Sequence, residues 1–329
     1  MSKRMVELIV RSYAPEDRTE WDAFITRSKN GTFLFMRGFM DYHSDRFVDA
    51  SALVTDAGGR LLALFPANRS GARIASHAGL SYGGMICDET MVAPLALDIF
   101  AAWFSYCRAQ GAEQIVYKAV PPIYHRMPAD EDRYALFYHG ATLYRRDMTQ
   151  TVDLVAQAPV QERRRRGARK AQKAGLVVRE SADINAFWDV LAGNLASRHG
   201  LRPVHTAEEL LLLQGRFPEN IRLFAVYEGE TLRAGTLLFL CGQTIHAQYI
   251  ASDDAARGLG ALDILFSTLL DLFRDKARYF DFGNSNEDEG TYLNRGLTEF
   301  KEGFGARAIV QDFFRLDLAQ WQPRSGEQR

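Results

Sequence analysis

The sequence predicts an α/β protein that contains two copies of one mixed sheet, each with a helix packed across it. The tetrapeptide Ala-Leu-Asp-Ile occurs at residues 96–99 and again at 261–264. Each copy follows a strand, a polar turn and a second strand, and precedes an amphipathic helix and an apolar strand. The flanking segments are residues 53–63 and 114–118 for the first copy, and residues 224–235 and 279–283 for the second. A repeat with so long a period fixes the architecture before any residue is given a role.

Length and composition agree with two compact domains. A chain of 329 residues corresponds to about two domains, and 47% hydrophobic residues suffice for two buried cores. The formal net charge of −1 argues against a general nucleic-acid binder. Cys87, Cys107 and Cys241 have neither the number nor the spacing of a disulfide framework or a zinc site, so no metal is expected. No secretion signal and no apolar run of about 18 residues is visible, which predicts a cytoplasmic protein without a membrane span.

Local signals predict the elements of an N-terminal domain over residues 1–158. Trp21, Phe24 and Ile25 follow helical spacing behind an acid-rich helix start. The turn at 56–59 is a hairpin signal. The chain breaks at Ala158-Pro159, and we place the domain boundary there. The expected elements are, in order, a strand at 5–12, a helix from 15, an aromatic helix at 30–43, a meander over 49–84, the repeat helix and its strand up to 118, and a bridging strand at 144–154.

A basic helix opens the C-terminal domain, residues 159–329. It carries four consecutive arginines at 163–166 and ends at Gly175, since glycine after the last helical residue is a normal helix stop. Arginine side chains match phosphate geometry, so the helix is a candidate patch for a nucleotide, a coenzyme or the acceptor stem of a transfer RNA. The alternative is a solvated connecting helix, because runs of charge usually face solvent.

A polar loop with two histidines follows the next expected helix, at 183–197. The loop covers residues 198–205, and Thr206 and Glu209 then form a capping box for a further helix. Because loops often carry ligand contacts, His205 is a candidate for binding substrate. The alternative is a structural role beside the helix start.

The order of these segments resembles the core of a GNAT acyltransferase. That core is represented by the strand at 244–251, the glycine-rich loop at 256–261, a helix and the strand at 279–283. The closing segment at 299–306 narrows the resemblance to the FemAB-like branch, whose members carry two GNAT domains in tandem. Residues 31–34 and the basic helix extend it over nearly the whole chain. The resemblance implies two tandem GNAT-like domains, each with a mixed, largely antiparallel sheet flanked by helices.

A glycine-rich turn at a helix N-terminus binds the pyrophosphate of coenzyme A in GNAT enzymes, because its N–H groups and the helix dipole favour an anion. Arg257, Gly258 and Gly260 match this pattern. The resemblance therefore implies acetyl-coenzyme A or another acyl-coenzyme A as co-substrate. Two positions depart from the pattern. Leu262 stands where glycine or alanine is usual, and Asp263 places an anion at the same helix end.

The strand before that turn is where GNAT enzymes bind the acyl group. Period-2 alternation places His246, Gln248 and Ile250 on one face. A polar pair on a strand that is otherwise core suggests a binding cleft, so His246 and Gln248 are candidate donor contacts. A buried structural histidine is the alternative.

The matching strand of the first repeat supplies candidate acceptor contacts. His77 lies in this strand, and Tyr82 follows it in an aromatic, glycine-rich stretch. In FemAB-like proteins the first domain helps to hold the acceptor, so the resemblance implies a substrate role for both residues. Asn284, in the loop after the last repeat strand, is a further candidate substrate contact.

Lys301 is the strongest candidate for catalysis. The resemblance places the lysine of the Phe-Lys motif near the reacting carbonyl, where a cation stabilises the developing oxyanion. The alternative is an exposed lysine that lies over Phe300 and Phe304. In the catalytic role, Lys301→Met is expected to lower turnover and barely alter stability. Asp281, at a strand end, is the second candidate. It either handles the proton and orients the amine, or caps the following asparagine-rich loop.

The predicted function is an N-acyltransferase that uses an acyl-coenzyme A donor. Its predicted acceptor is the amine of a nucleotide-linked amino sugar in bacterial surface polysaccharide synthesis, which rests on the resemblance alone. One alternative is an aminoacyl-transfer-RNA-dependent enzyme that forms a peptide bond on a cell-wall precursor, as the founding FemAB enzymes do. It predicts a helical arm and a broad positive surface. Another alternative is a non-catalytic ligand-binding GNAT-like protein, which Leu262 keeps open.

Overall fold

The chain folds into two compact units. The computed structural model describes residues 7–199 and 205–323. Unit 1 comprises the described residues up to Asp147 and from Val310 onward, and unit 2 comprises those from Met148 to Ile309. Each unit has its own core of buried apolar side chains.

Two strands carry the chain between the units. The chain enters unit 2 within β9 (Thr142–Asp153) and returns to unit 1 within β17 (Arg307–Asp317). In unit 1, β17 pairs antiparallel with β8 (Gln114–Lys118). The division therefore differs from the predicted boundary between residues 158 and 159, because strand pairing returns the last strand of the chain to the first unit.

The strands of unit 1 form two groups. Their bounds are β1 (Leu8–Ser12), β2 (Val48–Asp49), β3 (Ala52–Asp56), β4 (Leu61–Phe65), β5 (Asn68–Ser70), β6 (Arg73–Ala75) and β7 (Ile86–Cys87). One group is a four-stranded antiparallel sheet in the order β1-β3-β4-β7, and the other runs in the order β17-β8-β6-β5-β2. Within the second group β6 and β8 are parallel.

Helix α3 (Ala93–Ala109) supplies a long apolar face to the core of unit 1. Its first turn contains a proline. Proline suits this position because N–H groups of the first turn have no acceptor within the helix, so its missing N–H costs no hydrogen bond. Ile99, Trp103 and Cys107 recur every four residues and are all buried. The other helices are α1 (Arg18–Arg27), α2 (Arg37–Met40) and α4 (Glu131–Tyr138), with single-turn 3₁₀ helices at Pro15–Asp17, Phe33–Phe35, Asp41–His43 and Pro122–Tyr124.

One mixed sheet organises unit 2. Its strands are β10 (Leu176–Ser181), β11 (Ile221–Glu228), β12 (Thr231–Cys241), β13 (Thr244–Ser252) and β14 (Tyr279–Asn284), followed by the second half of β9. The order is β10-β11-β12-β13-β14-β9, in which β13 and β14 are parallel and the other neighbours antiparallel. The predicted mixed, largely antiparallel sheet flanked by helices is confirmed.

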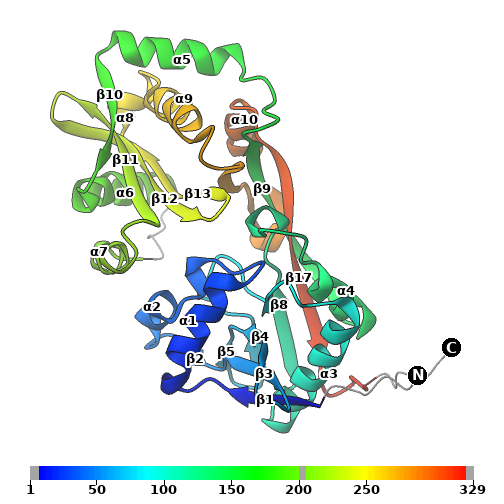
Figure 1. Cartoon of the computed structure of the whole chain (residues 1–329). Helices are drawn as coiled ribbons and strands as arrows, with labels where there is room; N and C mark the ends of the chain where they lie inside the picture. Colours follow the sequence, from blue (N-terminus) through cyan, green and yellow to red (C-terminus); the bar gives the residue numbers. More distant parts are fainter. Residues whose placement is uncertain (1–6, 200–204, 324–329) are drawn as a thin grey trace. The chain divides into compact units, whose positions relative to one another are not determined.

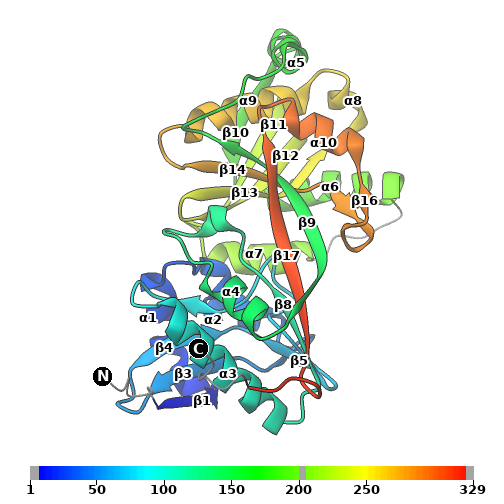
Figure 2. The same cartoon turned by 90° about the vertical axis from the view of Figure 1, so that its right-hand side faces the viewer.

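Helices cover both faces of this sheet. They are α5 (Glu162–Lys173), α6 (Ile184–His199), α7 (Ala207–Arg216), α8 (Asp254–Arg257), α9 (Ala261–Phe273) and α10 (Arg295–Glu302), with a 3₁₀ turn at Asp288–Gly290 between the short strands β15 (Asn286–Glu287) and β16 (Tyr292–Leu293). Figures 1 and 2 show α5 and α9 on one face of the sheet and α6 and α7 on the other. On the apolar side of α9, Phe266 packs on Phe280 and Phe282 of β14, and Phe273 packs on Phe224 of β11.

The two units repeat one sequence of elements, as the duplicated tetrapeptide predicts. In unit 1, strands β3, β4 and β6 lead to α3 and then to β8, which is parallel to β6. In unit 2, strands β11, β12 and β13 lead to α9 and then to β14, which is parallel to β13. Within the described ranges, no helix combines the length and the apolar composition needed to cross a bilayer.

Candidate active site

Strands β13 and β14 separate at His246 and Asp281. They pair through three residue pairs, and the last joins His246 to Asp281. Beyond it β13 continues along β12 with a β-bulge at Gln248, and β14 continues along β9 with Gly283 in a left-handed conformation, φ 75°. Both strands thus change course just after the same pair, and the two polar side chains lie where the strands part.

Asp281 is a buried carboxylate surrounded by donors. One of its oxygens, Oδ1, accepts the Gly283 N–H at 3.0 Å and the Thr151 hydroxyl at 3.2 Å. The Thr149 hydroxyl donates to the same oxygen. Both threonines come from β9, where period-2 alternation places them on one face. An ionised carboxylate can only accept, so this set of donors suits the charged form.

His246 completes a histidine–carboxylate pair. Its Nδ1 lies 2.9 Å from Oδ2 of Asp281, and its side chain is 15% exposed. Because the carboxylate accepts, we assign the ring proton to Nδ1, which leaves the lone pair on Nε2. The ring lies beside Gly283, where a Cβ would come within 3.4 Å of Cε1. This arrangement orients one ring nitrogen as a base at the point where the strands separate.

The bulge at Gln248 alters the predicted alternation of β13. Ala247 and Ile250 pack against the core on the α9 side of the sheet. Tyr249 instead contacts Trp188 of α6 on the other side, where the extra residue of the bulge has turned it. The prediction that Gln248 and Ile250 share a face is therefore wrong for Ile250. Gln248 keeps a buried Oε1 without a hydrogen-bond partner in the described part of the chain.

His205 contacts this region through Tyr249. Its Nδ1 lies 2.5 Å from the Tyr249 hydroxyl, and the two rings meet edge to face. Burial raises the pKa of Tyr249 to about 12, so the phenol is neutral at ordinary pH. The structure thus gives His205 a partner inside unit 2 and buries it, at 9% exposure. Its predicted contact with substrate stays a prediction.

Lys301 reaches the end of β14 from α10. Its Nζ donates to the carbonyl oxygens of Gly283 and Asn284, at 2.7 Å each. The side chain is 2% exposed, so the alternative of an exposed lysine is wrong, and the reason for expecting little change in stability, a surface position, does not hold. Burial lowers the pKa of Lys301 to about 7, against the opposing effect of Asp281. The structure brings Lys301 and Asp281 to the same strand end, and Asn284 takes part through its backbone.

The structure buries both of the predicted acceptor contacts in unit 1. Tyr82 is 3% exposed, donates its hydroxyl to Thr32 at 3.1 Å and packs against Tyr124. His77 is 4% exposed, has a positive φ of 52° and stacks on His43. Burial and the neighbouring His43 lower the pKa of His77 to about 3, so it is neutral. The two side chains fill the interior of unit 1, and their predicted contact with the acceptor stays a prediction.

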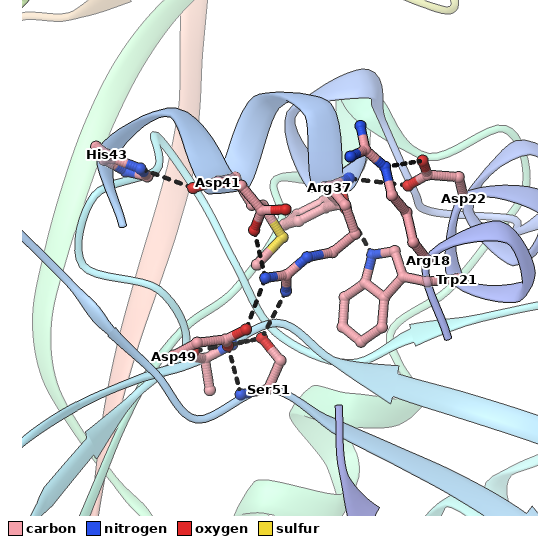
Figure 3. Close-up of polar contacts among 11 residues, drawn as sticks. Arg18, Trp21, Asp22, Arg37, Asp41, His43, Asp49 and Ser51 are labelled. Carbon is pink, nitrogen blue, oxygen red and sulfur yellow. Dashed lines mark hydrogen bonds and ion pairs between the residues drawn. The ribbon is translucent and has the colours of Figure 1, made fainter. Parts of the chain in front are cut away.

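Unit 1 has a separate polar cluster around Arg37, drawn in Figure 3. The Arg37 side chain is 5% exposed, pairs with Asp49 at 2.6 Å and with Asp41, and lies 3.8 Å from the centre of the Tyr13 ring. Its backbone N–H donates to Asp22 at 2.8 Å. These contacts tie α2 to α1 and to the segment before β3, which is a structural role.

The sequence did not single out Thr149, Thr151 or Tyr249. The two threonines alternate on a strand that was predicted, so a test for polar period-2 positions on that strand would have found them. Tyr249 reaches its face because of the bulge, which local alternation does not predict.

Residues 160–302 match the family model of the acetyltransferase (GNAT) domain. This part of the chain therefore matches a GNAT domain. No curated protein sequence matches the chain. Among solved structures, FemX is similar with a TM-score of 0.65 at 13% identity, over 92% of this chain and 96% of FemX. L-PGS from Bacillus licheniformis is similar with a TM-score of 0.60 at 13% identity, over 96% and 94%. A tandem GNAT protein from the clavulanic acid biosynthesis pathway has a TM-score of 0.51 at 12% identity, over 97% and 100%.

These structural likenesses show the fold, two GNAT-like domains in tandem, as the sequence predicts. Among the residues that the structure describes, no group of three or more histidine, cysteine, aspartate and glutamate side chains could hold a metal ion.

The turn that GNAT domains in general use for coenzyme A is covered here by α5. A side chain at Gly260 would overlap the backbone of Gly167, and a side chain at Gly167 would overlap the carboxylate of Asp263. Arg164 pairs with Asp263 at 2.6 Å, and Lys170 donates to the Gly258 carbonyl at 2.6 Å. Burial raises the pKa of Asp263, although Arg164 opposes the shift.

The other groups of this turn are also engaged within the protein. The N–H groups of Leu259 and Gly260 donate to the carbonyls of Ala256 and Arg257. The Arg257 guanidinium binds Asp254 and, at 3.2 Å, the Ser252 carbonyl. A pyrophosphate cannot reach the start of α9 while α5 occupies it. The residues present therefore do not fit the phosphate end of coenzyme A at this position.

Proposed function

We propose that unit 2 transfers an acyl group to a primary amine with His246 as the general base. The observation that carries the proposal is the His246–Asp281 pair at the separation of β13 and β14. Asp281 orients the ring, and Nε2 takes a proton from the attacking amine. A C–N bond forms, the bond from the acyl carbon to its carrier breaks, and the carrier leaves with a proton. The intact pair favours an enzyme over a non-catalytic binding protein.

We infer that the donor is an aminoacyl group on transfer RNA. The covered start of α9 disfavours coenzyme A. The outer side of α5 presents exposed cations that suit a phosphate backbone: Arg163, Arg165, Arg166, Arg169 and Lys173. One similar structure is the C-terminal domain of a putative lysylphosphatidylglycerol synthetase from Agrobacterium fabrum, whose name describes lysyl transfer (TM-score 0.61, 13% identity, 92% of each chain). The buried Oε1 of Gln248 is an acceptor that an N–H of the reactants would satisfy.

The second candidate is acyl-coenzyme A-dependent acylation of a nucleotide-linked amino sugar in surface polysaccharide synthesis. It is favoured by the GNAT domain match and by the turn at Arg257, Gly258 and Gly260, where Gly260 caps α9 in a left-handed conformation. On this proposal α5 would move away from α9 to admit the donor. The sugar acceptor rests on family resemblance.

A donor panel tests both candidates. The protein is incubated with aminoacyl-transfer RNA or with acetyl-coenzyme A, each with a panel of nucleotide amino sugars and amine-bearing cell-wall precursors, and products are detected by intact mass. We expect transfer from aminoacyl-transfer RNA and none from acetyl-coenzyme A. His246→Gln should abolish product while the melting temperature shows a folded protein. Product from acetyl-coenzyme A would select the second candidate, and no product from any donor would count against acyl transfer.

A further inference from the structure

Beyond the point where β13 and β14 separate, backbone carbonyls of β14 accept hydrogen bonds from a side chain. In a sheet, a carbonyl that faces a neighbouring strand accepts from that strand, and a buried carbonyl without a donor costs free energy. Pairing between the two strands ends at Asp281. Beyond Asp281, the backbone carbonyls of Gly283 and Asn284 both accept a hydrogen bond from Nζ of Lys301, at 2.7 Å each.

The helix that carries Lys301 is anchored to the same strand end. The Asn294 side chain caps α10 by accepting the Leu297 N–H at 3.0 Å, and the Asn294 N–H donates to the Ser285 carbonyl at 2.9 Å. Near its other end, Phe300 of the helix packs against the core of unit 2, and Phe304, just beyond the helix, lies within that core. The position of Nζ is therefore fixed by contacts at both ends of α10.

We propose that Lys301 is a positioning residue that holds β13 and β14 apart. Its amine takes the place of a strand partner for β14, and the backbone of β13 beyond His246 is thereby kept available for the acyl group. This role differs from the predicted contact with an oxyanion, and it rests on the proposed function of the same site. Two N–H groups suffice for two carbonyls, and the lysine amine has them with or without its charge.

The experiment compares Lys301→Met with Lys301→Cys that has been alkylated by 2-bromoethylamine, which restores an amine at the same reach. Without the amine we expect the melting temperature to fall by about 4–8 °C, since the Gly283 and Asn284 carbonyls both lose the bond from Nζ. Amide exchange in peptides covering 279–285 should become about tenfold faster. With substrates, the KM for the donor should rise more than kcat falls. The restored amine should reverse all of these changes.

A matched control lies on the same helix. Thr298 is buried and donates its hydroxyl to the Asn294 carbonyl at 3.0 Å, away from β14. Thr298→Val should leave both the exchange of 279–285 and the KM unchanged. Should Lys301→Met fail to fold, Lys301→Gln is measured instead: its shorter side chain keeps an N–H₂ donor, so it should fold and show smaller changes in the same direction.

Unchanged melting temperature and exchange together with a lower kcat would overturn the proposal and assign Lys301 to the reacting carbonyl. Melting and exchange are measured without substrate. They therefore test the positioning role even if the proposed transfer activity is absent.

Discussion

The parallel strand pairs of the two units begin alike and end differently. In unit 1, β6 and β8 pair through three residue pairs, the last joining Ala75 to Val116, as β13 and β14 do up to His246 and Asp281. Beyond that point in unit 1 the chain fills the space itself. The Lys118 N–H donates to the Ser76 hydroxyl at 2.7 Å, and the Lys118 carbonyl accepts from Gly83 at 2.9 Å.

The same fold has therefore produced one strand end closed by its own loop and one that carries the candidate site. In unit 1, the loop after β6 supplies the hydrogen bonds that the separating strands lose, and its apolar pair Ala75 and Val116 has no acid–base chemistry. In unit 2, a lysine from a helix supplies them, and the corresponding pair is a histidine and an aspartate. In a duplicated fold, the strand ends of one copy can thus serve structure alone when the other copy holds the candidate site.

The largest expected effect tests the chemical half of this contrast. Asp281→Asn should lower kcat by about 10³–10⁴-fold, because the amide no longer orients His246 with its lone pair on Nε2. The measurement is single-turnover acyl transfer. Val116→Thr, at the corresponding position of unit 1, is the matched control and should keep activity. Comparable losses in both variants would mean that the two strand ends share the chemistry.

Glycine substitutions test the packing half. A Cβ at Gly83 would overlap the Ser76 carbonyl, so Gly83→Ala should lower the free energy of unfolding by about 3 kcal/mol. At Gly283 there is room beside His246, and Gly283→Ala should cost only about 1 kcal/mol, from its left-handed backbone. Urea unfolding measures both. Equal costs would show that the two strand ends are packed alike.

The free energy of unfolding should depend on pH through a buried carboxylate of unit 1. Asp132 of unit 1 accepts the Tyr117 hydroxyl at 2.6 Å, and burial raises its pKa to about 6. The native state then holds this proton more tightly than the unfolded chain. Its contribution to stability is complete below about pH 4 and is lost as the pH rises to about 6, a fall of about 2 kcal/mol. Urea unfolding over this range, as wild type minus Asp132→Asn, should show that slope, and a flat difference would contradict it.

The architecture could be predicted from the sequence because both copies of the repeat show the same local pattern of strands, turns and helix. The duplicated tetrapeptide and its flanking strands gave the order of elements in both units, and the strand-end position of Asp281 gave one member of the site. His246 was predicted for its face of β13, which does not depend on the bulge that follows it. The basic helix was also found, as a run of arginines.

What could not be predicted depends on contacts between distant segments. The contact of α5 with the start of α9 needs Gly167 and Gly260 to meet, and each is an ordinary helix or turn glycine in its own sequence context. Lys301 is buried because its amine binds two backbone carbonyls at the end of β14. No periodicity in the sequence reveals such a contact. His77 and Tyr82 were expected to contact the acceptor because the resemblance gives the first domain that role, whereas the glycines of their stretch allow the loop to pack tightly inside unit 1.

The return of β17 to unit 1 reverses the expected order of folding on the ribosome. N-terminal domains generally fold first as they emerge. Here unit 1 lacks a strand until residues 310–317 have been made, by which time all of unit 2 has been translated. Until then β8 has an unpaired edge that invites pairing with other chains. Truncation after unit 2 would leave that edge permanently open, so the C-terminal segment protects the newly made chain from aggregation.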